Sequence, residues 1–203
     1  MIEEKGILPQ YHILMFETDN WPYTPAITQK VWTTPRPVRL LVIHDMEFPE
    51  VITAAEDIGR YFQHPDKPSS AHIGVDSNSI CQYVKDNNQA AGAPGANQDG
   101  IHIEFAGYGR ETREQWLDPY GISMLALGSD AVAQYCLKYS IPPMHLTNAQ
   151  LADKTQKGIV GHVQVSQVYQ LSDHTDPGPG FPWDYFIQSV RAFYNVRSTK
   201  VST

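Results

Sequence analysis

Four histidines and one glutamate occur where a fold could gather them into a reactive site. His44 ends an apolar run, His102 and Glu104 alternate with apolar residues, and His162 and His174 lie in a segment rich in Gly and Pro. Imidazole and carboxylate groups from distant segments are typical ligands of catalytic zinc, which keeps three protein ligands and one open position. The sequence has no HExxH helix and no tight Cys/His cluster, so spacing alone indicates a metal site only weakly.

Two predicted strands would position these side chains. Residues 39–44 form a short apolar run rich in branched residues, which is typical of a buried strand, with His44 on the same face as every second residue. Residues 101–105 alternate strictly, so His102 and Glu104 share the face opposite to three apolar side chains. The second strand therefore presents an imidazole and a carboxylate together.

Apolar periodicity and turn residues indicate the remaining elements. Helical spacing of apolar residues predicts helices, and a short polar connection between two apolar runs predicts a hairpin. Stretches dense in Gly, Pro and Asn predict irregular structure. The expected helices cover residues 50–63, 122–139 and 183–194, the hairpin covers 71–76 and 80–84, the segment 87–100 is a loop, and 158–182 cannot be regular throughout.

Length and composition predict one globular domain. The 203 residues, of which 41% are hydrophobic and 18% charged, are enough to bury a core. Prolines exclude a long helix from residues 1–38, which we expect to form an irregular N-terminal extension. The folded domain is then expected over residues 39–196, with a polar tail or linker stub over 197–203.

Net charge, the N-terminal sequence and the cysteines indicate which partners, cellular location and disulfides to expect. A net charge of -7 without any run of Lys or Arg argues against nucleic acid as a partner. The N-terminus lacks the pattern of a secretory signal and no apolar stretch could span a bilayer, so we expect synthesis in the cytoplasm without membrane insertion. Cys81 and Cys136 are interpreted as buried hydrophobic residues, and a disulfide is the less favoured alternative.

Three motifs follow one another along the chain: Leu41-Val-Ile-His44, then Gly100-Ile-His-Ile-Glu-Phe105, then Gly161-His162 followed by His174-Thr-Asp-Pro-Gly-Pro-Gly-Phe-Pro-Trp183. Together they resemble the zinc amidase family that includes amidase-type phage lysozymes, bacterial muramoyl-peptide amidases and animal peptidoglycan recognition proteins. The last motif is the most specific of the three. The resemblance implies an α/β fold with a single domain, in which a central mixed β-sheet is flanked by helices.

At the matching positions, the resemblance implies a Zn2+ ion held by His44, His162 and Asp176, with Glu104 as the general base. Zinc in such a site lowers the pKa of its water to about 7, and a neighbouring carboxylate can transfer the proton to the leaving nitrogen. The implied substrate is peptidoglycan, cut at the amide between N-acetylmuramic acid and L-alanine. We expect a monomeric phage endolysin that reaches the cell wall after holin-type release, with a cytoplasmic recycling amidase as the alternative.

The sequence departs from the family pattern at two places. The family commonly has a lysine two residues before the aspartate ligand, where it steadies the oxyanion, and this chain has His174. A neutral imidazole still donates one hydrogen bond, so we predict that His174 takes this role. Relatives often carry Trp-His-Ala-Gly at Gln89-Ala-Ala-Gly92, which leaves recognition of the peptide stem by this loop open.

Several assignments have competing explanations. Asp176-Pro-Gly also favours a simple turn, and Glu104 also suits a solvated strand face. The role of His102 is open, and a structural role is favoured for His72. A peptidoglycan-binding module without activity and a zinc peptidase that cuts within the stem are the rival functions. Three aromatic residues either line a groove or pack into the core: Trp21, Tyr23 and Trp32.

Overall fold

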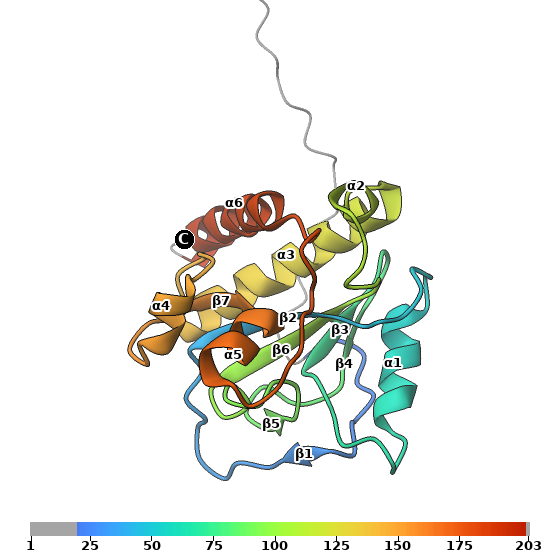
Figure 1. Cartoon of the computed structure of the whole chain (residues 1–203). Coiled ribbons are helices and arrows are strands. Elements are labelled where there is room, and N and C mark those ends of the chain that lie inside the picture. The colour runs from blue at the N-terminus through green and yellow to red at the C-terminus, as the bar shows by residue number, and fades with distance from the viewer. Residues whose placement is uncertain (1–19, 202–203) are drawn as a thin grey trace, which may run out of the picture.

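The computed structural model describes residues 20–201, which are built around a five-stranded sheet of order β4-β3-β6-β2-β7 (Figure 1). Neighbouring strands pair in parallel, except that β3 and β4 form the predicted antiparallel hairpin. The sheet is therefore mixed and flanked by helices, as expected. Its strands are β2 (Leu40–Asp45), β3 (Ile73–Val75), β4 (Ile80–Gln82), β6 (Gly100–Phe105) and β7 (Gly158–Gly161).

Helices cover both faces of this sheet, which explains why β2 is buried along its whole length. Leu41 and Ile43 of β2 belong to a large core that also contains residues of α1, α3 and α6, whereas Leu40 and Val42 belong to a smaller core with α4 and α5. In Figure 1, α3 passes behind the sheet and α5 lies in front of it. The helices are α1 (Ala54–Phe62), α2 (Arg113–Trp116), α3 (Pro119–Tyr139), α4 (Asn148–Ala152), α5 (His162–Tyr169) and α6 (Trp183–Val201).

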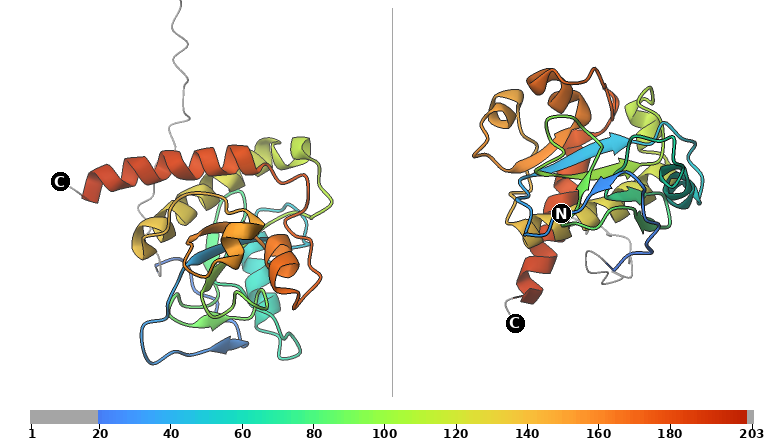
Figure 2. Two further views of the ribbon diagram at one scale, coloured as in Figure 1. Left: turned by 60° about the vertical axis from the view of Figure 1, so that its left-hand side comes forward. Right: turned by 90° about the horizontal axis from the view of Figure 1, so that it is seen from below.

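The last helix is longer than predicted. It was expected over residues 183–194, followed by a polar tail from residue 197, but α6 continues to Val201. Figure 2 shows α6 lying over α3, and this contact explains the extension. Arg197 places Nε and Nη2 each 2.5 Å from a carboxylate oxygen of Asp130 on α3, so the expected tail is anchored through an ion pair.

The predicted helices 50–63 and 122–139 differ from α1 and α3 in detail. Helix α1 starts only at Ala54, because the N–H of Val51 donates to the carbonyl of Pro49 in a preceding turn. In α3, Ile122 was expected on the core-facing stripe, but its side chain is 37% exposed. The stripe that packs on the sheet instead contains small residues such as Gly128, which lies directly against the ring of Phe105.

Several short elements lie in segments where periodicity predicted none. Helices α2 and α4 both begin with a capping box, formed by Thr112 with Gln115 and by Thr147 with Gln150. Ser/Thr followed three residues later by Glu/Gln is a recognised signal for a helix start, so these two helices had a readable signature. Strand β7 and helix α5 occupy the first part of the segment 158–182, and no helix or strand covers residues 170–182, so this segment is not regular throughout, as expected.

The N-terminal extension is packed on the domain from residue 20 onward, and residues 1–19 lie outside the described part. Trp21 is 4% exposed, and its ring lies 5.8 Å from that of Tyr135 on α3. Tyr23 is 42% exposed and Trp32 is half-buried, so burial explains only the first of the three aromatic residues. A two-stranded pair joins the extension to the predicted loop 87–100, and it consists of β1 (Gln29–Lys30) and β5 (Gln89–Ala90).

Cys81 and Cys136 are both buried and free, as interpreted from the sequence. Within residues 20–201, none of the helices combines the length and the apolar character that crossing a bilayer requires.

Candidate metal centre

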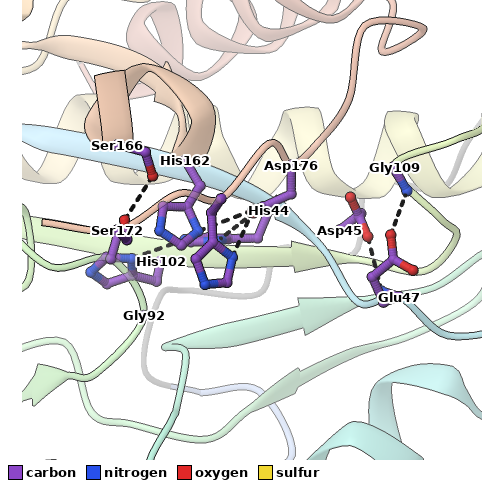
Figure 3. A network of polar contacts seen from close by, with 12 residues as sticks. His44, Asp45, Glu47, Gly92, His102, Gly109, His162, Ser166, Ser172 and Asp176 are labelled. Atoms are coloured by element: carbon purple, nitrogen blue, oxygen red, sulfur yellow. Dashed lines mark hydrogen bonds and ion pairs between the residues drawn. The ribbon is translucent and has the colours of Figure 1, made fainter. Parts of the chain in front are cut away.

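The three predicted ligands meet above one end of the sheet. His44 lies near the end of β2, His162 is the first residue of α5 directly after β7, and Asp176 lies in the loop before α6. Nδ1 of His44 is 2.9 Å from Oδ2 of Asp176, and Nδ1 of His162 is 3.1 Å from Oδ1 of the same carboxylate. One ligand atom from each residue lies within 4.8 Å of the others, and Figure 3 shows the three side chains pointing toward one another.

Backbone pairing explains how residues so far apart in the chain converge. In the parallel pair of β2 and β7, Ile43 is the register partner of Gly161, so His44 and His162 each come one residue later. The N–H of Val163 then donates to the carbonyl of Asp176 over 2.9 Å, which joins the start of α5 to the Asp-Pro-Gly segment. That segment is both a turn and part of the site, since the N–H of Gly178 donates to the carbonyl of Thr175.

The charges in this cluster suit a metal ligand set. Burial by itself would raise the pKa of Asp176, but hydrogen bonds from His162 and His44 outweigh burial and hold the pKa well below its ordinary value. Burial lowers the pKa of His162 to about 4. An ionised carboxylate and a neutral imidazole are the forms that bind a metal. Burial opposes a charge on His44, but Glu104 and Asp176 together raise its pKa, so metal binding would release a proton there.

Glu104 lies beside His44 in neighbouring strands. The two residues are register partners in the parallel pair of β2 and β6, and their side chains therefore point to the same face of the sheet. Burial raises the pKa of Glu104 to about 8, against the lowering effect of His44, and the negative charges of Asp176 and Asp45 add to the rise. The side chain lines a hollow with the three candidate ligands and is not a solvated residue on an open strand face.

His174 lies at the outer side of the same cluster. Its ring stacks on that of His162 with centroids 4.1 Å apart and planes 18° from parallel, and its Nδ1 is 3.3 Å from Oδ1 of Asp176. The side chain is 58% exposed, whereas those of His44 and His162 are almost fully buried. His174 is therefore the imidazole of this cluster that a molecule in the hollow can approach directly.

The sequence of this chain matches a known enzyme family. The profile of the family described as N-acetylmuramoyl-L-alanine amidase matches residues 34–179, which is well over half of the chain. The chain belongs to this amidase family. The expected enzyme class, an amidase acting on peptidoglycan, is thereby confirmed at the level of the family. A search among curated proteins gives no significant match for this amidase.

Solved structures of similar fold support the same architecture. The Staphylococcus aureus hydrolase AmiA in complex with its ligand has a TM-score of 0.65 and 17% identity, covering 88% of the amidase described here and 83% of that chain. A mutant endolysin from Bacillus subtilis has a TM-score of 0.51 and 18% identity, with coverages of 81% and 97%. A derivative of AmpD has a TM-score of 0.54 and 19% identity, with coverages of 85% and 93%. At these identities the likeness establishes the fold.

The hollow beside the candidate ligands has a volume of about 960 Å³ and is lined by both apolar and polar side chains. The apolar side chains come from α1 and the segment after β2, and the polar side chains include charged groups. The amidase can thus hold a ligand that has both an apolar side and hydrogen-bonding groups. The apolar lining residues are Met46, Phe48, Ile58, Tyr61 and Phe62, and the polar ones include Glu47, Arg110, Asp173, His174 and Thr175.

Sequence reasoning missed two residues of this centre. Asp45 is 6% exposed, and its Oδ1 accepts the N–H of Glu47, but its Oδ2 has no hydrogen-bond partner among residues 20–201. Burial raises the pKa of this carboxyl to about 7. Arg110 stacks on Tyr108 with its guanidinium carbon 3.9 Å from the ring centroid. Neither residue belongs to a periodic or spaced pattern, so no sequence signal pointed to them.

The remaining expectations for the site concern the loop 89–92 with Trp32 and the two histidines His102 and His72. Gly92 of the loop 89–92 lines the hollow, whereas Gln89 and Trp32 line a separate hollow of about 910 Å³. His102, whose role was open, lies against His44, with Nδ1 of His102 3.0 Å from Nε2 of His44. His72 is fully buried behind His102, in agreement with the structural role favoured for it.

Proposed function

We propose that the chain is a zinc-dependent amidase that hydrolyses the bond between N-acetylmuramic acid and L-alanine in peptidoglycan. The observation that carries this proposal is the convergence of His44, His162 and Asp176 on one point beside a hollow. In this proposal residues 39–196 form the catalytic unit, and each chain acts as a monomer.

The residues present fit a zinc ion in number and in chemistry. Two imidazoles and one carboxylate are a recognised ligand set of catalytic zinc, which leaves one coordination position open. Both imidazoles direct Nδ1 toward the same carboxylate, and the pKa values of His162 and Asp176 favour the forms that bind metal. When bound, zinc supplies a Lewis acid that polarises a carbonyl and lowers the pKa of water.

Glu104 is proposed as the general base. It accepts a proton from the attacking water and returns it to the amide nitrogen as the bond breaks. Its pKa of about 8 in the metal-free protein would keep much of it protonated at neutral pH. A dication held by His44, His162 and Asp176 would lower this pKa, because a nearby positive charge favours the ionised carboxylate. Zinc binding and ionisation of the base are therefore coupled.

His174 is proposed as the hydrogen-bond donor to the oxyanion. Its exposed ring stands at the edge of the hollow and stacks on His162, so a substrate carbonyl can reach it without any movement of the core. The ring donates one hydrogen bond when neutral, and stacking limits its rotation, which is the preorganisation that oxyanion stabilisation requires.

The proposed site of action is the bacterial cell wall, as a phage endolysin that arrives after holin-type release. Support comes from the family match and from the likeness to an endolysin and to AmiA. A cytoplasmic recycling role is the alternative, and the likeness to AmpD keeps it open. Activity on intact, polymeric cell wall would favour the endolysin role, and activity only on soluble muropeptides would favour recycling.

The test is to digest purified cell wall and identify the new chemical ends. A free lactyl carboxyl on muramic acid together with a free L-alanine amine supports the proposal. New ends within the peptide stem would make the enzyme a peptidase, and the absence of new ends would make it a binding module. The controls are a chelator, which should abolish hydrolysis until zinc is restored, and His64→Ala, an exposed histidine outside the hollow that should leave hydrolysis unchanged.

A further inference from the structure

One buried imidazole lies outside the proposed ligand set but contacts one of its members. His102 places Nδ1 3.0 Å from Nε2 of His44, the ring nitrogen that does not face Asp176 (Figure 3). The other ring nitrogen, Nδ1 of His44, is 2.9 Å from Oδ2 of Asp176. The ring of His44 is therefore held from both sides, by the ligand carboxylate on one side and by His102 on the other.

Proton counting determines the direction of the contact between the two rings. A neutral imidazole that offers Nδ1 to a metal carries its single proton on Nε2. His44 must then donate from Nε2, so the facing Nδ1 of His102 must be the acceptor. His102 in turn carries its proton on its own Nε2. That atom is buried and has no hydrogen-bond partner within residues 20–201.

The ring nitrogen of His102 that is unpaired within the described residues lowers the stability of the fold. His102 is fully buried in the middle of β6, where its register partner is the apolar Val42. Burying a ring nitrogen without a partner costs free energy, whereas a leucine would fill the same space without that cost. Stability of the sheet therefore does not explain an imidazole at this position, and the hydrogen bond to His44 does.

The ring of His102 is itself fixed by its surroundings. It stacks on His72 with centroids 5.7 Å apart and planes 15° from parallel, and its backbone N–H donates to Nδ1 of His72 over 3.0 Å. Nε2 of His72 lies 3.1 Å from the carbonyl oxygen of Asn88. Gly92 leaves room for the ring, because a Cβ at that position would lie 2.7 Å from Nδ1 of His102. These contacts come from the residue directly before β3 and from the loop before β6.

We propose that His102 is a positioning residue, which fixes the tautomer and the ring orientation of His44 and thereby strengthens metal binding by His44, His162 and Asp176. The inference rests on the proposed zinc site and is independent of the roles of Glu104 and His174. Outer partners of metal-bound histidines typically change metal affinity by about 10- to 100-fold, which is the effect expected here.

The test compares His102→Leu with His102→Asn, two variants of nearly equal size. The side-chain oxygen of asparagine can occupy the place of Nδ1 and accept a hydrogen bond, but leucine cannot. Zinc affinity is measured by competition with a fluorescent chelator. We expect H102L to bind zinc about 10- to 100-fold more weakly and H102N to bind close to the wild type. Leu151→Ala, a buried substitution in the smaller core, is the control for general loosening and should keep wild-type affinity.

The possible outcomes separate this inference from the proposed function. Absence of zinc binding by the wild type would overturn both. Zinc binding by the wild type with equal affinity in H102L, or equal weakening in H102L and H102N, would overturn the role of His102 alone. Should H102L fail to fold, a long-range 1H–15N spectrum of the zinc-loaded wild type decides. We expect the ring protons of His44 and His102 on Nε2, and a proton on Nδ1 of His102 would contradict the inference.

Discussion

A row of imidazoles runs through the candidate metal centre, and its two ends differ in exposure. At the inner end, His72 and His102 are fully buried and stack on each other. At the outer end, His174 is 58% exposed and stacks on His162. Between these ends His44 contacts both His102 and His162. Histidine therefore serves two purposes in this centre. The buried inner rings can only hold a metal-ligating side chain in place, whereas the exposed outer ring can contact a substrate.

The two ends also differ in their electrostatic surroundings. Burial, together with the positive charges of neighbouring groups, holds the pKa of His102 well below its ordinary value, so this inner ring is neutral. The outer ring of His174 stands in solvent beside the carboxylate of Asp176, 3.3 Å away. A neutral inner ring can accept the hydrogen bond from His44, whereas an exposed outer ring can donate one to a substrate. The following predictions test this division of roles.

The largest effect is expected where the inner and outer parts of the row meet. Asp176 contacts His44, His162 and His174, and Asp176→Asn removes its charge while preserving its size. We expect loss of bound zinc and a fall in hydrolysis of more than about 100-fold, beyond the range for outer partners of metal ligands. The measurement is zinc content after dialysis together with turnover, and full zinc occupancy in D176N would contradict the ligand assignment.

The second effect concerns the proposed base. Glu104→Gln should lower turnover by about 10²- to 10⁴-fold, the usual contribution of general acid–base catalysis, while zinc remains bound. Glu114→Gln is the matched control, because Glu114 is exposed and does not line the hollow. If E104Q lost its zinc, Glu104 would belong to the ligand set and not to the proton-transfer step.

The outer end of the row can be tested separately. His174→Ala should lower turnover by about 10²-fold, the lower end for the loss of one oxyanion donor, because the ring is largely exposed. Zinc affinity should stay near that of the wild type, and His174→Lys should restore turnover. Weaker zinc binding in H174A would show that His174 is a metal ligand, and the proposed difference in role between the inner and outer rings would then be wrong.

The smallest effect is a pH dependence of stability in the metal-free protein. Glu104 has a pKa of about 8 when folded against an ordinary value of 4.5, so the folded protein keeps a proton that the unfolded chain releases. The free energy of unfolding should therefore fall as pH rises. Above pH 6.5 the opposing effect of His162, whose folded pKa is about 4, is already complete.

Chemical denaturation between about pH 6.5 and pH 8 measures this effect. We expect a fall of about 1 to 2 kcal/mol in the wild type, from roughly 1.4 kcal/mol per pH unit and proton. In E104Q the fall should be shallower but not absent, because Asp45 also has a raised pKa of about 7. An equally steep fall in E104Q would show that Glu104 is ionised in the metal-free protein.

Local patterns predicted the parts of the centre that lie at strand ends. The apolar run before His44 and the alternation around Glu104 determine which face each side chain takes, and the structure agrees with both. The fold class also follows, because buried parallel strands need helices on both faces of the sheet. The motif around Asp176 indicated a turn with a carboxylate, and both features are present.

Other parts depend on register and on long-range packing, which a single sequence does not reveal. The contact between His44 and His102 exists because β2 and β6 pair with Val42 opposite His102, and nothing in either strand specifies that register. The extension of α6 beyond residue 196 accompanies the packing of α6 on α3, which includes an ion pair between Arg197 and Asp130, 67 positions apart in the chain. Both the register and the helix extension depend on contacts between distant segments, which local sequence patterns do not predict.

The most direct test of the ligand set is anomalous diffraction at the zinc absorption edge from a crystal of the zinc-loaded protein. The account predicts a single strong peak within bonding distance of Nδ1 of His44, Nδ1 of His162 and a carboxylate oxygen of Asp176. A peak bound to other side chains, or a zinc-soaked crystal without a peak between these three residues, would contradict it.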